Sequence, residues 1–260
     1  MEKKFNEITN EIAVYRTDKK LLGFSDKFNT ADVKNYSRIH AQGDEIEGER
    51  KYSNIGVYAW DYSTGKDTIM TDFNISPEEA QYLFSQLQML QVWQATHAVQ
   101  KSQLSIMQML KKLIRFQDSK FDDEPKVDDV MFEFSSDKIF GDPDKDGLCQ
   151  MKKLRFIRQT VDKRSGELLK YPWYVEIDNG KAKKVTNAKG GAYAQSGSYK
   201  SLKKVFVRIS DLDLYKLLCR VNSFITVWET AVGCRLVVEG KKIYDVKTAE
   251  DKAKRAKNVN

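Results

Sequence analysis

The sequence predicts an α+β fold built as an internal pseudo-dimer, in which two repeats each hold about four antiparallel strands and then a helix. Three observations predict this fold: a short pattern that occurs twice, strand-like segments before each copy, and a strongly basic second half. The 260 residues are 41% hydrophobic and include four prolines, a composition that indicates a folded chain. Length alone permits one large domain or two small ones.

The repeated pattern lies in residues 74–93 and 208–229, and the two copies align at an offset of 134. The matched pairs are Ile75 with Ile209, Ser76 with Ser210, Leu83 with Leu217, Leu87 with Val221, Leu90 with Phe224 and, after a one-residue slip, Trp93 with Trp228. Each serine is placed as a helix N-cap, and apolar residues follow it at helical spacing. A chance match of two capped amphipathic helices is the alternative, because these residue types are common.

Strand patterns precede both helices. Residues 53–75 predict a hairpin that turns at residues 63–66, and residues 168–185 predict one that turns at Asp178-Asn179-Gly180. Further strands are expected at residues 11–15, 36–42, 45–51, 129–134 and 149–161. We therefore expect a first repeat over residues 1–120, a second and basic repeat over residues 126–246, and a disordered basic tail over residues 247–260.

A further amphipathic segment, Leu104 to Phe116, continues or restarts the first helix. Its apolar face could pack on the core of the protein or pair with another chain, which makes a homo-oligomer possible.

Positive charge is concentrated in one part of the chain. Residues 1–125 hold 16 basic and 19 acidic side chains, a net charge of −3, whereas residues 126–260 hold 28 and 18, a net charge of +10. Residues 148–208 alone hold 15 basic and 4 acidic side chains. Such a segment indicates a polyanionic partner, although lysine-rich strands can also be solvated sheet edges.

Aromatic residues alternate along the strands that accompany these cations. Tyr58 and Trp60 share one face of the first hairpin, and Tyr171 and Trp173 share one face of the second, with Tyr174 on the opposite face. Rows of rings are either core or, where they lie exposed beside lysines, stacking platforms for unpaired bases. As nucleic-acid-binding residues we predict these four rings together with Lys152, Lys153, Arg155, Arg158, Lys181, Lys183, Lys184, Lys203 and Lys204.

Residues 187–201 predict a Gly-, Ser- and Tyr-rich loop between two basic strands. Its Tyr193, Tyr199, Lys189 and Lys200 could close over a bound strand, or the loop could be a simple connector.

The sequence contains no pattern that indicates a catalytic site, a metal site or a cofactor site. Residues 142–148 resemble half of a calcium loop, but Lys153 takes the place of the final glutamate ligand. His40 and His97 lie in unrelated segments, and the three cysteines share no close spacing. No apolar run approaches the length of a membrane span and the N-terminus is not that of a signal peptide, so we expect a cytoplasmic protein with no membrane partner.

The repeated order of about four strands and a helix, with a capped helix after each basic sheet, resembles the Whirly and Pur families of single-stranded DNA-binding proteins. The resemblance covers about residues 11–245 and concerns architecture alone, since the lysine-rich signature of the plant Whirly proteins is not present. It implies two sheets set at an angle with helices between them, and nucleic acid running over the sheet edges and outer faces.

We therefore expect a non-enzymatic protein that binds single-stranded nucleic acid, with DNA favoured over RNA. A structural or assembly protein of a phage or mobile element, which oligomerises through residues 104–116, is the alternative. An enzyme with a site assembled from scattered residues is the third possibility, and it would contain a deep pocket lined by carboxylates or by His40.

Overall fold

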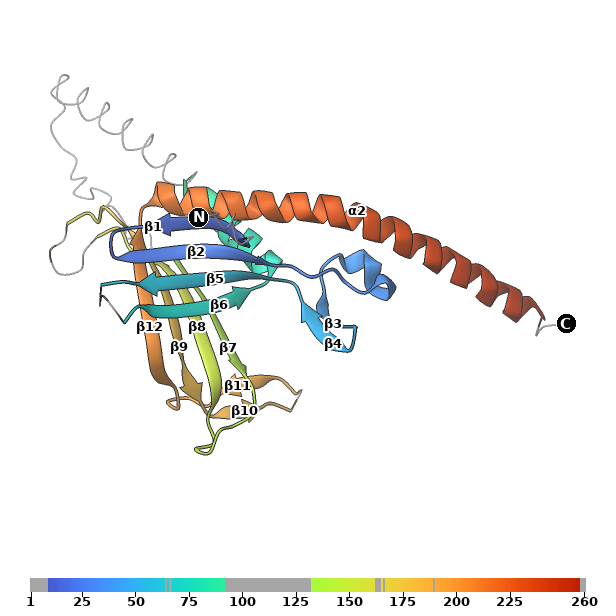
Figure 1. The fold of residues 1–260 in the computed structure, drawn as a ribbon, viewed down its shortest axis with the longest axis horizontal. Helices are drawn as coiled ribbons and strands as arrows, with labels where there is room; N and C mark the ends of the chain where they lie inside the picture. Colours follow the sequence, from blue (N-terminus) through green and yellow to red (C-terminus); the bar gives the residue numbers. More distant parts are fainter. Residues whose placement is uncertain are drawn as a thin grey trace, which may run out of the picture.

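The computed structural model describes residues 9–91 and 132–257, without residues 64, 66, 162–164, 166 and 189. Within these residues the chain forms two four-stranded antiparallel sheets and a long C-terminal helix, which confirms the α+β prediction. In Figure 1 the strands of one sheet run across those of the other.

The first sheet is an antiparallel meander with strands in chain order, and a helix over residues 77–91 follows it. Its strands are β1 (Glu11–Arg16), β2 (Lys20–Lys27), β5 (Asn54–Asp61) and β6 (Ile69–Ile75). The hairpin predicted over residues 53–75 is confirmed, because β5 and β6 pair across it.

The second sheet is also a meander in chain order, and helix α2 (Asp211–Lys257) follows it. Its strands are β7 (Phe132–Phe140), β8 (Cys149–Arg158), β9 (Trp173–Ala182) and β12 (Lys200–Ile209).

Smaller elements lie in the connections between the strands of the two sheets. Between β2 and β5 lie the 3-10 helix η1 (Val33–Arg38) and a small arm formed by β3 (Gln42–Ile46) and β4 (Glu49–Tyr52). Residues 36–42, which we expected as a strand, therefore hold the end of η1 and the first residue of β3. Between β9 and β12 lies a hairpin of β10 (Lys184–Thr186) and β11 (Ala192–Ala194), at the end of the second sheet far from α2 (Figure 1).

Both predicted helix starts have the expected caps. Ser76 Oγ accepts the backbone N–H of Glu79 at 3.1 Å, and Glu79 Oε2 accepts that of Ser76 at 2.7 Å, which completes a capping box. Ser210 Oγ likewise accepts the backbone N–H of Asp213 at 3.1 Å. Each start satisfies an N–H group that the helix itself cannot, and so both helices begin at the serine.

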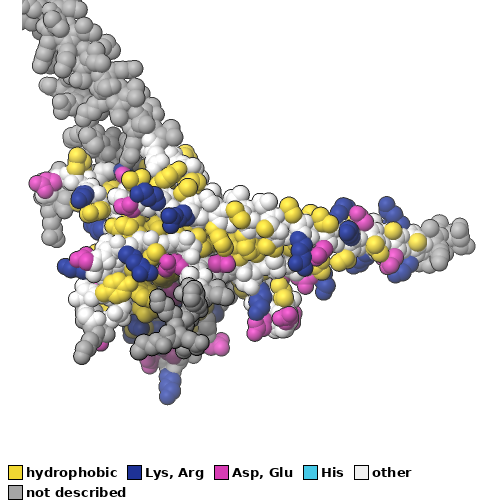
Figure 2. Space-filling view, turned by 45° about the horizontal axis from the view of Figure 1, so that its top comes forward, with side chains coloured by type: hydrophobic (Ala, Val, Ile, Leu, Met, Phe, Trp, Pro, Cys, Tyr) yellow, Lys and Arg dark blue, Asp and Glu magenta, His cyan; other side chains and the backbone are white. Residues whose placement is uncertain are grey.

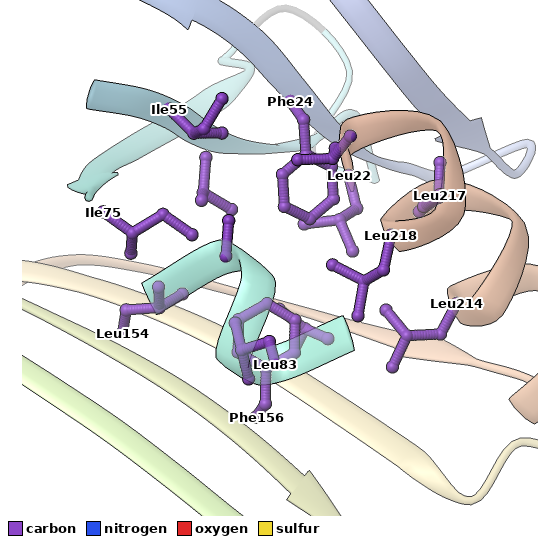
Figure 3. Close-up of a cluster of buried hydrophobic side chains, with 14 of the residues drawn as sticks. Leu22, Phe24, Ile55, Ile75, Leu83, Leu154, Phe156, Leu214, Leu217 and Leu218 are labelled. Carbon is purple, nitrogen blue, oxygen red and sulfur yellow. The ribbon is translucent and has the colours of Figure 1, made fainter. Parts of the chain in front are cut away.

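One hydrophobic core lies between the two sheets and the two helices (Figure 3). Leu83, on the helix at residues 77–91, is buried between side chains of the first sheet and of β8. The remaining side chains labelled there are Leu22, Phe24, Ile55 and Ile75 of the first sheet, Leu154 and Phe156 of β8, and Leu214, Leu217 and Leu218 of α2. Full burial of one such side chain contributes about 1.5–3 kcal/mol, so the shared core holds both halves together.

A charged group anchors the start of α2 to the second sheet. Arg158 donates from Nε and Nη2 to the two carboxylate oxygens of Asp211, at 2.9 and 3.0 Å. Trp173 Nε1 donates to Asp211 Oδ1 at 2.7 Å. Arg158 and Trp173 are both 2% exposed, whereas the Asp211 side chain is 34% exposed, so this anchor is a bidentate and partly desolvated contact.

Helix α2 continues far beyond the sheets. Its 47 residues span about 70 Å, and its C-terminal part projects from the body (Figure 1). Two glycines let η1 and its following residue lie directly against the helix: a Cβ on Gly233 would be 2.9 Å from Ile39 Cδ1, and one on Gly240 would be 2.3 Å from Tyr36. Residues 247–257, which we expected to be disordered, form the last turns of this helix.

The hairpin turn predicted at Asp178-Asn179-Gly180 is wrong. These residues lie inside β9, where Asn179 pairs with Lys152 of β8 and with Lys203 of β12. Gly180 instead lies where β9 and β12 approach closely, because a Cβ there would be 2.2 Å from the backbone oxygen of Lys200. Glycine permits this close approach of two strands, and the chain reverses later, through β10 and β11.

The Asp211 anchor predicts an acid-sensitive stability. Burial raises the pKa of the Asp211 carboxyl, but the hydrogen bonds and charge of Arg158, with the Trp173 hydrogen bond, hold the pKa below its usual value. A lowered folded-state pKa adds stability above the unfolded value of about 3.9, and this stability is lost as pH falls through the folded value. Asp211→Asn should lower the free energy of unfolding by about 2–4 kcal/mol at pH 7, measured by urea denaturation.

The difference in the free energy of unfolding between this variant and the wild type should narrow below about pH 4, where Asp211 of the unfolded chain takes up a proton, and should be lost as pH falls through the lower pKa of the folded state. Asp251→Asn, at an exposed position late on the same helix, is the control. It should leave the free energy of unfolding unchanged both at pH 7 and below about pH 4. A difference that stays constant from pH 7 to pH 3 would contradict the assigned role of the Asp211 charge.

Candidate nucleic-acid interface

The structure contradicts two of the predicted nucleic-acid contacts, Arg158 and Trp173. Both are buried against Asp211 and point toward the core, so neither can reach a ligand on the surface. The alternation of β9 was correctly recognised, but the wrong set of residues was taken to face outward. With Trp173 inside, Tyr174 lies on the outer face of the second sheet, the face turned away from the core.

Tyr58 and Trp60 lie elsewhere, on the first sheet. They form a row with Tyr62, with ring centroids 6.2 and 6.0 Å apart, on the face opposite the buried residues of β5. The Tyr58 hydroxyl donates to Glu11 at 2.6 Å, and the pKa of this tyrosine is raised by burial and then by that hydrogen bond. Tyr171 is exposed in the segment before β9, beside Lys170. These rings do not share the outer face of the second sheet.

Three predicted cations lie on the face of the second sheet that carries the core, near its far end. Lys152 forms an ion pair with Asp72 of β6 at 2.6 Å, and Lys181 forms one with Asp144 at 2.7 Å. Lys203 pairs across the ladder with Asn179 and is exposed. Ion pairs therefore hold Lys152 and Lys181 to the protein, and binding to a phosphate would have to compete with those carboxylates.

The remaining strand cations do converge. Lys153 and Arg155 of β8 and Lys204 of β12 lie on the outer face, where Arg208 joins them. Cross-strand register places Arg155, Glu176 and Phe206 in one row across β8, β9 and β12, and the next row holds Ile157, Tyr174 and Arg208. Four cations and two rings thus occupy one continuous surface, which we call the outer face.

The two rings form a pair with cations around it. Phe206 is 41% exposed and stacks on Tyr174, with centroids 5.1 Å apart and planes at 24°. Lys20 Nζ lies over the Phe206 ring, 3.5 Å from its centroid, and is held there by the Phe206 backbone oxygen at 2.8 Å and by Asp61 at 3.3 Å, so a base that stacks on Phe206 has to compete with it. The Arg208 guanidinium lies 5.3 Å from the Tyr174 ring centroid. An aromatic surface with adjacent cations is suited to stacking a base while the cations contact phosphates.

Two buried carboxylates, Glu176 and Asp178, organise the outer face. Glu176 accepts a hydrogen bond from the Tyr174 hydroxyl at 2.6 Å and forms an ion pair with Lys204 at 2.7 Å. Burial and then the Glu176 hydrogen bond raise the pKa of Tyr174, so its hydroxyl stays a neutral donor. Asp178 accepts from Ser201 Oγ at 2.6 Å. Four cations against two carboxylates leave an excess of two positive charges on β8, β9 and β12.

Edge strand β7 reduces this positive charge on its own side. Its Asp137 lies opposite Lys153, and its Glu133 lies opposite Ile157. Lys153 also places its Nζ 3.8 Å from the ring centroid of Tyr199. The surface most favourable to an anion therefore lies toward β12, around Arg155, Lys204 and Arg208.

The described part of residues 187–201, which we predicted as a loop, holds β11, a turn at residues 195–198 and the start of β12, and β11 pairs with β10 just before it. With residues 141–148 these residues form the end of the second sheet, which we call the tip. Lys183, Lys184 and Lys200 are exposed there, and so is Tyr193. Tyr199 is not free to close over a ligand, because its hydroxyl donates to the Asp178 backbone oxygen at 3.1 Å. Lys189 lies outside the described residues.

His40 takes part in an arrangement that resembles a catalytic triad. Its Nδ1 lies 2.7 Å from Ser53 Oγ, its Nε2 lies 3.1 Å from Glu229 Oε1, and its ring stacks on Trp228. A nucleophile needs access to substrate, yet Ser53 and His40 are both buried, and Ser53 Oγ accepts the backbone N–H of Asn29. The described geometry is that of a polar joint between α2 and the segment before β5.

In the described part of the chain no cluster of three His, Cys, Asp or Glu side chains could hold a metal ion. Asp144, in the segment that resembles a calcium loop, accepts the backbone N–H groups of Asp146 and Leu148 as well as Lys181 Nζ. Its carboxylate therefore organises the loop itself.

Comparisons of the chain with protein-family models, with curated proteins and with solved structures found no match. No helix among the described residues is long and apolar enough to cross a membrane. Sequence reasoning missed Phe206, Arg208 and the outward position of Tyr174. The signal that would have found them is the apolar alternation Val205, Val207, Ile209, which leads directly into the capped helix and identifies the inner face.

Because Trp173 is buried and Trp60 is half-buried, their replacement by phenylalanine should lower the free energy of unfolding by different amounts. Trp173→Phe removes a buried N–H that bonds to Asp211 and leaves unfilled space, so it should lower the free energy of unfolding by about 1–3 kcal/mol. Trp60→Phe, at a half-buried position on the first sheet, should cost less than about 1 kcal/mol. Urea denaturation measures both, and equal costs would contradict the buried position of Trp173.

Proposed function

We propose that this protein binds single-stranded nucleic acid without catalysing a reaction, and that it does so on the outer face of the second sheet. The observation that carries the proposal is the stacked Tyr174–Phe206 pair, in which an exposed Phe206 lies among Lys20, Arg155, Lys204 and Arg208. Stacking on a ring contributes about 1–3 kcal/mol per base and is open to any base, whereas paired bases in a duplex are not available for it.

The architecture supports the same proposal. Each half of the described chain is a four-stranded antiparallel meander followed by a serine-capped helix, as expected for an internal pseudo-dimer. We propose that the two halves are related in this way and that the fold is similar to that of the Whirly and Pur families. Sheets set across one another leave an outer face on each side, which in such a fold is the surface open to a nucleic-acid strand.

Oligonucleotide binding tests this function. Filter binding should give a tighter complex with single-stranded DNA or RNA than with duplex DNA, and log K should fall linearly with log salt concentration. Phe206→Ala should weaken binding about tenfold at constant salt, because it removes the stacking surface. Arg155→Gln should weaken binding and reduce the salt slope by about one, because one phosphate contact is lost.

Matched controls are available on other surfaces. Met70→Ala removes an exposed apolar side chain of the first sheet, and Lys34→Gln removes one positive charge from η1. Both should leave the affinity within about twofold of wild type. The proposal fails if binding is independent of salt, if duplex DNA binds equally well, or if the controls weaken binding as much as Phe206→Ala and Arg155→Gln.

A second candidate is a structural or assembly role, which the projecting part of α2 favours. Beyond Gly240 the side chains of Ile243, Tyr244 and Val246 are each more than half exposed. Figure 2 shows hydrophobic side chains between charged ones along the projecting helix. Exposed apolar residues that recur along a helix are typical of contacts with another chain. Residues 104–116, through which we expected assembly, lie outside the described residues.

Size-exclusion chromatography with light scattering tests this second role. If α2 assembles the protein, the measured mass should exceed 30.0 kDa and rise with concentration. Ile243→Lys combined with Val246→Lys should then return the mass to that of one chain, since a charge in an apolar contact is costly. Leu212→Lys, at an exposed position near the start of α2, is the control. A monomer at every concentration would exclude assembly through α2.

A further inference from the structure

The tip contains an open hollow of about 320 Å³. Two lysines and the turn at residues 195–198 form most of its wall, and one acidic residue of the 141–148 loop completes it. The residues that line the hollow are Asp146, Leu148, Lys183, Gln195, Ser196, Gly197, Ser198 and Lys200.

Hydrogen bonds hold the turn in a defined shape. The backbone N–H of Ser198 bonds to the Gln195 oxygen at 3.1 Å, and Ser198 Oγ donates to that same oxygen at 2.7 Å. Ser198 Oγ also accepts the backbone N–H of Lys183 at 3.0 Å, and Gln195 N–H donates to the Lys183 oxygen. The turn is thus fastened to the strand segment that carries Lys183, and Gly197 takes a left-handed backbone with φ 73°.

Several donors at this hollow have no partner within the described residues. The two central residues of the turn, Ser196 and Gly197, use neither backbone N–H in a hydrogen bond. Lys183 Nζ and Lys200 Nζ form no ion pair, in contrast to Lys152, Lys181 and Lys204. One hollow is thus lined by a turn with two unbonded amides and by two lysines without an ion pair, and such donors are suited to an anion with several oxygens.

Asp146 is the feature that opposes an anion here. Its carboxylate lines the same hollow and forms no ion pair in the described chain, so it repels a phosphate that the lysines attract. The balance of two lysines against one carboxylate leaves one positive charge, and the amides add to it. Substitutions can therefore change the affinity for phosphate in either direction: loss of a lysine should weaken binding, and loss of the Asp146 charge should tighten it.

We propose that this hollow binds a phosphate group of the nucleic-acid strand that lies on the outer face. This step rests on the proposed function, because β12 begins at Lys200 in the hollow and carries Phe206 six residues later. Lys200 lies opposite Lys181 in the ladder and therefore on the other face from Phe206, so the nucleic-acid strand reaches it around the end of the sheet. Six strand residues span about 20 Å, so a single strand stacked on Phe206 could continue along β12 to the tip. The phosphate is either internal to the strand or at its end, and both present the same oxygens to Lys183 and Lys200.

Titration of the full chain with inorganic phosphate, followed by amide NMR, tests the hollow by itself. The Ser196 and Gly197 amide signals should shift and saturate. Lys183→Gln and Lys200→Gln should each weaken this binding about fivefold, and Asp146→Asn should tighten it by a similar factor. Lys184→Gln is the matched control, since Lys184 is exposed beside Lys183 but does not line the hollow. Unmoved amide signals, or equal effects of Lys183→Gln and Lys184→Gln, would overturn the proposal.

Oligonucleotides then separate the two sources of phosphate and the two proposals. A terminal phosphate is the ligand if a 5′- or 3′-phosphorylated strand binds at least fivefold tighter than the unphosphorylated one and Lys200→Gln abolishes the difference. An internal phosphate is the ligand if Lys200→Gln weakens both strands equally. Oligonucleotide binding that is lost in Phe206→Ala but unchanged in Lys183→Gln and Lys200→Gln would overturn the hollow alone. Phosphate binding without oligonucleotide binding would instead overturn the proposed function and its link to the hollow.

Discussion

The contact of Asp211 with Arg158 and Trp173 ties the start of α2 to the covered face of the second sheet, the face that carries the buried apolar residues. The three residues come from the start of α2, the end of β8 and the start of β9, so one carboxylate joins a helix to two neighbouring strands. Because side chains alternate along a strand, drawing Arg158 and Trp173 inward requires Arg155 and Tyr174 to point outward. The anchor of α2 and the buried apolar residues of β8, β9 and β12 thus lie on one face, and the aromatic pair lies on the other.

Local chemistry made part of the fold predictable. The serines at positions 76 and 210 and the hairpin over residues 53–75 are signals that act within a few residues, and they hold. Gly180 shows the limit of such signals, because glycine after Asp and Asn is equally compatible with a turn and with the close approach of a neighbouring strand. The approach of Lys200 depends on pairing between distant segments, which no short pattern contains.

For the candidate site too, local pattern predicts part of the arrangement and contacts between distant segments decide the rest. Period-two alternation alone separates Lys153 and Arg155 from Arg158, but we predicted all three as contacts, and which face is open depends on what covers the sheet. We predicted Trp173 as a surface ring because of its basic neighbours, yet the ring is buried and its indole N–H donates to Asp211, 38 residues later in the chain. The predicted residues do not converge: none of the four predicted rings lies on the outer face, and only three of the nine predicted cations do. The rings on that face are Tyr174 and Phe206.

The two glycines of α2, at positions 233 and 240, give the longest helix of the described chain a second point of attachment. They are seven residues apart and therefore lie on the same side of the helix, where Ile39 and Tyr36 rest against its backbone. The helix is consequently held at two places about 45 Å apart, its capped start and Gly240. Two contacts restrict rotation and translation of α2 relative to the sheets. They therefore set the direction in which the helix projects beyond Gly240.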